Sequence, residues 1–278
     1  MIHSLKEAYP IALMCALAGV ARSSYYAFAR PRSAPLNSPQ LLDAARQIHL
    51  ENRCSYGSRR MAQALQHQGL AIGRYRARTL MRQAQLTVSK PRTHRYRKVE
   101  GEAHIASNLL DRRFEPGAIN RVWAGDITYL RTRKGWSYLA IVMDLHSRRI
   151  VGWAFDTQAD TELVIQALQH ARRSRKPATG LMFHSDQGCQ YTSARFVDDL
   201  KNAGIVQSMS RKGNCWDNAV VERFFRSLKS EWIGEQEYES HEEADKDIRE
   251  YMEKYYNYRR LHSAANNLPP VLYEASCS

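Results

Sequence analysis

Two aspartates and one glutamate stand where their sequence surroundings do not favour a charge. Asp126 interrupts the strand-like run RVWAGDITYLRT, and aspartate is depleted in strand interiors. Asp186 belongs to the stretch HSDQGCQY, residues 184–191, which follows the apolar run 180–183. Glu222 lies in DNAVVERFFRSLKSEW, whose apolar residues recur at helical spacing. If the three carboxylates lie close together they repel one another, and a divalent cation is the usual compensation.

Each acid taken singly has an ordinary structural explanation. An aspartate at a strand end is usually a turn residue, and a glutamate on a helix is usually solvated. Asp186 could also belong to a His-Ser-Asp hydrolytic site. However, His184 and Ser185 are neighbours along a strand and should point to opposite faces, and Ser185 lacks a G-x-S-x-G elbow. The three acids taken together favour a metal site.

The donor set indicates which metal to expect. Carboxylate oxygens without nearby cysteine, and with no histidine required, suit Mg²⁺ or Mn²⁺ rather than zinc. A pair of such ions can activate a water or a 3′-hydroxyl and stabilise the leaving oxygen of a phosphoryl transfer. A fourth acid, Asp144, ends a strand beside the turn HSRR, and we assign it a structural role. Phosphate-binding P-loops and dinucleotide glycine fingerprints are absent from the sequence.

The elements that must position these acids form a mixed α/β pattern. Three strand-like runs joined by short turns are followed by helix, strand, helix, strand and a long helix over residues 218–231, with a last helix over 241–258. In such a sheet the first strand is central and the fourth lies beside it, so Asp126 and Asp186 can converge. On the long helix Asn218, Glu222, Arg226 and Lys229 share one polar face. This order of elements fits a ribonuclease H-like five-stranded sheet, and it fits other α/β folds as well.

The charge of the chain is concentrated near its N-terminus. The 278 residues carry a net charge of +13. Residues 1–110 hold 17 Lys and Arg against 5 Asp and Glu, a net of +12, whereas residues 111–278 hold 24 against 23. A basic first part ahead of a nearly neutral body indicates a module that binds a polyanion, and nucleic acid is the partner we expect.

The pattern of this basic part predicts helices separated by linkers that contain helix-breaking residues. We expect a short helical segment over residues 1–30, a proline-rich linker at 31–39 and a helix-turn-helix-like DNA-binding region over 40–100, ending in a polar connector at 89–102. In its third helix Arg74, Arg78 and Arg82 recur every four residues and share a face. Three arginines in a row repel one another unless an anion lies alongside, so we predict that they contact phosphates.

The cysteines and the apolar segments indicate the cellular compartment in which the protein is found. Five cysteines, at 15, 54, 189, 215 and 277, form no CxxC pair and have no zinc-ligand spacing to histidine. The apolar stretch 11–21 resembles a signal-peptide core but lacks a basic flank, and no apolar run approaches membrane-spanning length. We expect a soluble intracellular protein that keeps its thiols reduced.

Several blocks, in this order, make a family resemblance specific. The blocks WAGDITYLRT, VMDLHSRRIVGWA, FHSDQGCQYTS, SMSRKGNCWDNAVVERFFRSLKSEW and YYNYRRLH resemble the second-frame (orfB) transposases of the IS-three family of bacterial insertion sequences, which belong with retroviral integrases to the DDE group. The resemblance runs through residues 115–262, and the 35 residues between Asp186 and Glu222 match the spacing of that group. Residues 46–100 resemble the helix-turn-helix segment that precedes the family's catalytic domain.

The resemblance implies what each part does. It implies a ribonuclease H-like core over residues 112–276, with Asp126, Asp186 and Glu222 binding Mg²⁺ as the catalytic triad, Mn²⁺ as a substitute and two ions in all. It implies that Asn218 and Lys229 contact transposon-end DNA, and that the element moves by copy-out through a circular intermediate. It also implies a multimer on DNA in the bacterial cytoplasm, at the nucleoid, with the first-frame product as a fusion or partner. The segment SAANNLPPVLYE departs from the family by lacking a Gly-Tyr pair.

Two other functions remain compatible with the residues. One is a ribonuclease H-like nuclease that cleaves without joining. The other is a DNA-binding regulator of transposition with a silent active site, although the intact acidic set argues against it.

Overall fold

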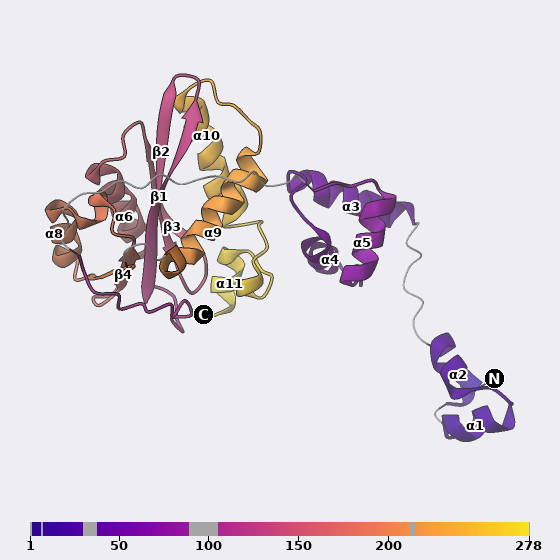
Figure 1. Cartoon of the computed structure of the whole chain (residues 1–278). Coiled ribbons are helices and arrows are strands. Elements are labelled where there is room, and N and C mark those ends of the chain that lie inside the picture. Colours follow the sequence, from indigo (N-terminus) through magenta and orange to yellow (C-terminus); the bar gives the residue numbers. More distant parts are fainter. Residues whose placement is uncertain (1, 7, 30–37, 89–104, 212–214, 278) are drawn as a thin grey trace. The chain divides into compact units, whose positions relative to one another are not determined.

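The computed structural model describes the chain in two compact units. The described residues are all except 1, 7, 30–37, 89–104, 212–214 and 278 (Figure 1). One unit comprises residues 1–50 and 57–87, and the other comprises residues 51–56 and 88–278. The predicted linker and connector fall almost entirely outside the described residues, except that Pro39 already begins a helix.

The N-terminal unit is helical, as predicted. Its elements are the 3-10 helix η1 (Ile2–Leu5) and the α-helices α1 (Ile11–Leu17), α2 (Arg22–Ala29), α3 (Pro39–Glu51), α4 (Ser58–His67) and α5 (Arg74–Gln83). Helices α3 to α5 are amphipathic and each buries one apolar stripe. The buried residues are Leu41, Ala45 and Ile48 on α3, Met61, Ala62 and Leu65 on α4, and Ala77, Leu80 and Met81 on α5.

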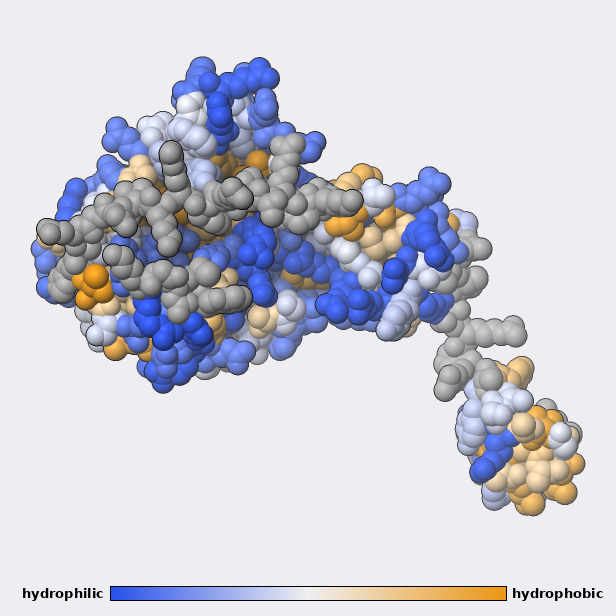
Figure 2. All heavy atoms as spheres, viewed as in Figure 1, coloured by the Kyte–Doolittle hydropathy of each residue, from blue (hydrophilic) through white to orange (hydrophobic). Residues whose placement is uncertain are grey.

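Helices α1 and α2 bury little apolar surface. Cys15 and Tyr25 are buried there, whereas Leu13, Leu17 and Phe28 are 52%, 81% and 73% exposed. The orange surface over these two helices in Figure 2 shows this apolar face.

The second unit is built on a five-stranded mixed sheet. The strands are β1 (Val122–Thr132), β2 (Gly135–Asp144), β3 (Ile150–Asp156), β4 (Met182–Ser185) and β5 (Val206–Met209), in the spatial order β3-β2-β1-β4-β5. The first three strands are antiparallel, while β4 is parallel to both β1 and β5. This is the ribonuclease H-like arrangement, and it confirms that the first strand is central and the fourth lies beside it.

Helices cover both faces of this sheet (Figure 1). One face carries α6 (Thr161–Arg175), α7 (Cys189–Thr192) and α8 (Ala194–Asn202), which pack on residues such as Trp123, Val142 and Phe183. The other face carries α9 (Ala219–Ser227), the π-helix η3 (Leu228–Ile233), α10 (His241–Glu250) and the π-helix η4 (Tyr251–Tyr256). The 3-10 helices η2 (Cys215–Asn218) and η5 (Ser263–Ala265) and the last helix α11 (Pro270–Ser276) complete the unit.

Short polar residues start the main helices by accepting backbone hydrogen bonds. Asp160 caps α6 by accepting from the backbone N–H of Leu163 at 3.0 Å, and Ser193 and Ser240 cap α8 and α10 in the same way. Gly152 lets α6 approach β3 closely, because a Cβ at this position would overlap the backbone oxygen of Ala167 and lie 2.5 Å from the backbone nitrogen of Ala171.

The helix predicted over residues 218–231 is present, but it is not a single α-helix. The chain forms a 3-10 turn through Asn218, an α-helix from Ala219 to Ser227 and a π-helix from Leu228 to Ile233. Asn218 therefore precedes the α-helix instead of sharing its polar face. The helix predicted over 241–258 likewise changes from α to π at Tyr251.

Candidate active site

The strand register brings Asp126 and Asp186 to the same level of the sheet. In the parallel pair of β1 and β4, Ala124 lies opposite His184. Two residues further along each chain are Asp126 and Asp186. Residues two apart along a strand share a face, and Ala124 packs in the core that contains α9, so the Asp126 side chain belongs to the α9 side of β1. Asp126 lies within β1, whereas Asp186 directly follows the last residue of β4.

Helix α9 brings the third acid to this point. Its apolar residues Val221, Phe224 and Phe225 are buried against the sheet, in the same core as Ala124 and Leu130. Glu222, next to Val221, is half-buried.

The pKa values of Asp126 and Glu222 are raised in part by the charges of neighbouring acids of this group. Burial raises the pKa of Asp126 well above its ordinary value, and the charges of Asp186 and Glu222 raise it further. Burial also raises the pKa of Asp186 and of Glu222, and the charge of Asp186 adds to the effect on Glu222. Desolvation therefore acts on all three carboxyls, and like charge adds to it for Asp126 and Glu222, while the charge of Arg226 opposes it for Glu222.

Within the described residues, three other largely buried carboxylates of this unit form ion pairs with arginine, whereas Asp126, Asp186 and Glu222 do not. Glu274 pairs with Arg175 at 2.8 Å, Asp217 with Arg112 at 2.9 Å and Glu231 with Arg260 at 2.7 Å. Within the described residues, none of Asp126, Asp186 and Glu222 forms such an ion pair. A bound cation would compensate the unpaired negative charge of these carboxylates.

The donor set fits a hard divalent cation. Asp126 Oδ1 accepts from the N–H of Ile127 at 2.8 Å, and Asp186 Oδ1 accepts from the N–H of Gly188 at 3.0 Å, which fixes one oxygen of each carboxylate. Carboxylate oxygens are the ligands that Mg²⁺ prefers. In the described part of the chain, no three His, Cys, Asp or Glu side chains are already gathered tightly enough to hold a metal ion. Binding would therefore require these side chains to move toward the cation.

Lys229 lies beside Asp126, on the π-helix η3. Its Nζ is 4.6 Å from the centroid of the Tyr129 ring, and the neighbouring charge of Asp126 favours its protonated form. Burial has the larger effect and lowers the pKa of Lys229. This lysine is thus partly desolvated and close to Asp126. It lies beside Tyr129, in the part of β1 that follows the residues paired with β4.

Asn218 is placed differently from the expectation for a DNA contact. It is only 6% exposed, and its Nδ2 donates to the backbone oxygen of Gly125 at 3.3 Å. This bond ties the start of α9 to the residue that precedes Asp126. In this structure Asn218 is therefore part of the framework of the site.

The neighbours of Asp186 do not form a hydrolase pair. His184 is fully buried, and its Nε2 donates to the backbone oxygen of Asp217 at 3.1 Å while its Nδ1 accepts from the Ser208 hydroxyl at 2.9 Å. Burial lowers the pKa of His184 to about 4, so the ring is neutral at pH 7. The Ser185 hydroxyl donates instead to the backbone oxygen of Asp186 at 2.9 Å. His184 and Ser185 therefore do not bond to each other, while His184 Nε2 also lies 3.2 Å from the Ser210 hydroxyl.

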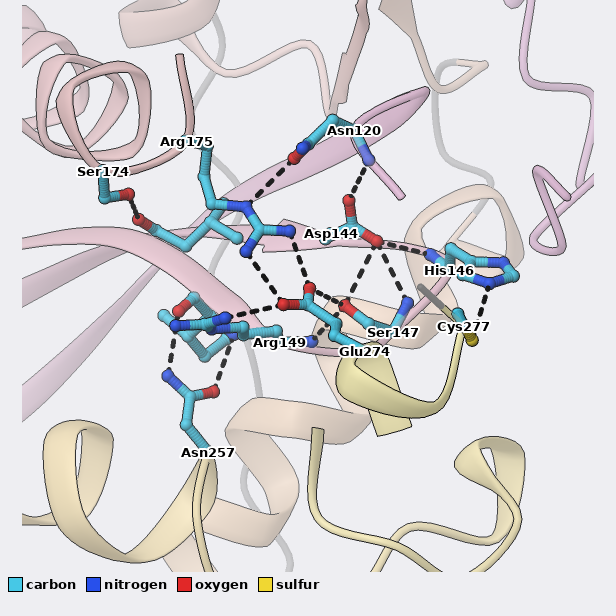
Figure 3. A network of polar contacts seen from close by, with 12 residues as sticks. Asn120, Asp144, His146, Ser147, Arg149, Ser174, Arg175, Asn257, Glu274 and Cys277 are labelled. Atoms are coloured by element: carbon cyan, nitrogen blue, oxygen red, sulfur yellow. Dashed lines mark hydrogen bonds and ion pairs between the residues drawn. The ribbon is translucent and has the colours of Figure 1, made fainter. Parts of the chain in front are cut away.

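Asp144 has the structural role predicted for it. Its carboxylate is fully buried and accepts from the N–H groups of Asn120, His146 and Ser147 at 2.6–3.0 Å (Figure 3). It closes the turn after β2, level with Trp123, three residues before Asp126 along β1.

The three arginines of α5 lie on the surface of the N-terminal unit. Arg74, Arg78 and Arg82 are all exposed, and the guanidinium carbon of Arg74 lies 5.9 Å from the ring centroid of Tyr75, which is 80% exposed. The helix contains no acidic residue. Its outer face is consequently cationic.

Sequence reasoning missed two residues of the site. Tyr191 on α7 is buried, and burial is the main reason that the pKa of its hydroxyl is raised. The charges of Asp126 and Asp186 raise this pKa further, so Tyr191 lies near both acids. Its place five residues after Asp186, in HSDQGCQY, was the available signal. Asp217, just before Asn218, is bonded to residues over 100 positions away, which no local pattern reveals.

Comparison with known proteins matches both units to described families. Residues 117–215 and 203–270 match two family descriptions that both read integrase core domain, and residues 38–95 match an HTH-like domain. The 31 kDa protein of insertion element IS600 of Shigella sonnei is 36% identical over 265 residues, covering 94% of this chain and 97% of that protein. Transposase InsF of insertion sequence IS3A of Escherichia coli K12 is 35% identical over 280 residues, covering 98% and 96%. The transposase of IS904 of Lactococcus lactis is 35% identical, covering 88% and 97%.

Solved structures of integrases are also similar. The catalytic core domain of HTLV-2 integrase in complex with magnesium has a TM-score of 0.45 and 17% identity, covering 58% of this chain and 97% of that one. A simian T-cell lymphotropic virus intasome has a TM-score of 0.47 and 16% identity, covering 83% and 74%.

The sheet and the matched domains together define a protein with an integrase-type core and an HTH-like domain. The extent of the sequence identity then gives the family: the chain belongs to the insertion-sequence transposases of the IS3 type, and its function is DNA transposition and integration. No helix among the described residues is both long and apolar enough to cross a membrane.

Proposed function

We propose that the chain cleaves the ends of an insertion sequence and joins them to target DNA, with Asp126, Asp186 and Glu222 as ligands of catalytic Mg²⁺. The observation that carries this proposal is the register of β1 and β4, in which Ala124 lies opposite His184, each of them two residues before one of the aspartates. The raised pKa of each carboxyl supports it, as does the absence of an arginine ion pair to any of the three acids within the described residues.

The reaction has two phosphoryl transfers at this one site. First, a water oxygen attacks a phosphorus at the element's end, the bond from phosphorus to the 3′ oxygen breaks, and that oxygen leaves as a 3′-hydroxyl. Then the 3′-hydroxyl oxygen attacks a target phosphodiester and forms one P–O bond as another breaks. When bound, two Mg²⁺ ions, or Mn²⁺ in their place, supply Lewis acidity that activates the attacking oxygen and stabilises the leaving one.

The protein's own residues hold and orient these groups. Asp126 and Asp186, each anchored by a backbone N–H, provide fixed oxygens, and Glu222 closes from α9. Lys229, partly desolvated beside Asp126, would approach a phosphate of the end DNA bound there. Asn218 holds α9 to β1 and is better assigned to positioning than to a DNA contact.

The HTH-like region provides the complementary DNA contacts in this proposal. Arg74, Arg78 and Arg82 would lie along a phosphate backbone, as their exposed common face favours. We extend the proposal to a multimer assembled on DNA at the bacterial nucleoid, with the first-frame product as a fusion or partner.

A joining assay tests the proposed function against its nearest rival. The protein is incubated with a labelled duplex that carries the element's terminal repeat, unlabelled plasmid and Mg²⁺. We expect label to be released as a 3′-hydroxyl end and then to appear covalently in the plasmid. Hydrolysis without any joined product would favour a ribonuclease H-like nuclease, and binding without cleavage would favour a silent regulator.

A further inference from the structure

Asp217 is a fully buried carboxylate held by three side chains, two of which come from the distant segment 108–112. Its Oδ2 accepts from Asn108 Nδ2 at 2.9 Å and from Arg211 Nε at 3.0 Å, and its Oδ1 accepts from Arg112 Nε at 2.9 Å. Arg211 also donates through its backbone N–H and Nη2, both at 3.1 Å. Hydrogen bonds from Arg211 hold the pKa of Asp217 well below its ordinary value, so it is charged at neutral pH. The catalytic scheme does not use this charge.

Asp217 and Asn218 contact β4 and β1, the strand that ends just before Asp186 and the strand that contains Asp126. The backbone oxygen of Asp217 accepts from His184 on β4, two residues before Asp186. The next residue, Asn218, donates to Gly125 on β1, one residue before Asp126. Glu222 follows four residues later on α9. The start of α9 is thus fastened at one point to the two strands whose acids Glu222 must meet.

The segment ahead of the core is fastened to the same point. Asn108 and Arg112 bind the Asp217 carboxylate, and the N–H groups of Leu109 and Leu110 donate to the Ser208 hydroxyl at 3.0 and 3.2 Å. That hydroxyl in turn donates to His184. A chain of hydrogen bonds therefore runs from residues 108–112 through β5 and β4 to the start of α9.

We propose that Asp217 is a positioning residue that sets Glu222 against Asp126 and Asp186, and that residues 108–112 hold it in place. The inference rests on the proposed role of the three acids. Because Asp217 is anchored while Glu222 is only half-buried, the anchor limits where α9 can carry the third ligand. Loss of the anchor should loosen the metal site before it unfolds the domain.

A second buried carboxylate of the same unit provides a matched control. Glu274 is 6% exposed and accepts from Arg175 at 2.8 Å, Arg149 at 2.6 Å and the Ser147 hydroxyl at 2.8 Å (Figure 3). Like Asp217, it is a buried carboxylate bonded to two arginines, although its arginines are more buried. It joins α11 to the turn after β2, which is level with Trp123, three residues before Asp126 along β1. A purely structural role predicts the same behaviour for both residues.

The experiment compares Asp217→Asn with Glu274→Gln in the joining assay, titrating Mg²⁺ and recording the melting temperature of each variant. Both substitutions should lower the melting temperature, because each replaces a buried, hydrogen-bonded carboxylate that faces arginine donors with an amide. We expect D217N to raise the Mg²⁺ concentration for half-maximal joining at least about tenfold, a change of about 1.4 kcal/mol in apparent binding. Mn²⁺ should restore part of the rate. E274Q should leave the Mg²⁺ dependence within about twofold of wild type.

A D217N protein with wild-type Mg²⁺ dependence, or an equal shift in E274Q, would overturn the positioning role. Asn108→Ala removes only one 2.9 Å bond to Asp217 and serves if D217N does not fold. It should shift the Mg²⁺ dependence about threefold, and an unchanged dependence would count against the inference. Asp126→Asn is measured in parallel, and it distinguishes a failure of the positioning role from a failure of the proposed function. If D126N is inactive while D217N behaves as E274Q, only the positioning role fails, whereas an active D126N refutes the proposed function.

Discussion

Replacing Asp126 by Asn is expected to lower the rates of end cleavage and joining by about 10³-fold or more while leaving the fold intact. Asp126 lies within the central strand and is the acid whose charge is most opposed by burial and by its neighbours. Metal ions supply several kcal/mol of transition-state stabilisation in phosphoryl transfer, and about 4 kcal/mol corresponds to about 10³-fold in rate. The joining assay under saturating Mg²⁺ measures the loss.

The same substitution should make the metal-free protein slightly more stable. The Asp126 carboxyl is desolvated beside two other acids, and an amide of similar shape removes a destabilising charge. We expect the melting temperature without metal to rise by a few degrees, and the stabilisation that Mg²⁺ gives the wild type by mass action to disappear. Asp156→Asn, at the end of the edge strand β3, is the control and should change neither quantity. Retained Mg²⁺ stabilisation in D126N would contradict the assignment.

Replacing Arg74, Arg78 and Arg82 together by Ala is expected to weaken DNA binding and flatten its dependence on salt. Each phosphate contact contributes about 0.9 to the slope of log affinity against log salt concentration, so three lost contacts should reduce the slope by about 2.7. In low salt such a change corresponds to an affinity loss on the order of 100-fold. Fluorescence anisotropy with an end-containing duplex, over a series of salt concentrations, measures both values.

The control for the arginine face is Arg46→Ala. Arg46 is also exposed on a helix of the N-terminal unit, but it is already paired with Asp43 at 3.1 Å. Its removal should leave the salt slope unchanged. If the triple substitution also leaves the slope unchanged, the α5 face is an ordinary solvated surface.

The position of the three acids was predictable because each one breaks a local rule. An aspartate inside an apolar strand and a glutamate beside a buried helical stripe are visible from spacing alone, and the expected sheet order placed Asp126 beside Asp186. The structure adds the register of Ala124 with His184, which makes the two acids level. Strand register depends on the packing of whole elements, so the sequence pattern did not specify it.

The side chains around the acids were less predictable, because helix type and distant partners decide their places. A straight helix over 218–231 would put Asn218 and Lys229 on one face with Glu222. The 3-10 turn instead buries Asn218 against Gly125, and the π-helix carries Lys229 to the ring of Tyr129. Asp217 meets Arg112 across 105 positions, and only the folded sheet brings such residues together.

The location of a bound metal is the most direct test of the catalytic site. Crystals of the protein grown with Mn²⁺ and DNA bearing the terminal repeat would be measured at the manganese absorption edge, where the ion scatters anomalously. We predict anomalous peaks coordinated by carboxylate oxygens of Asp126, Asp186 and Glu222. Peaks located elsewhere, with these three side chains unligated, would contradict the account.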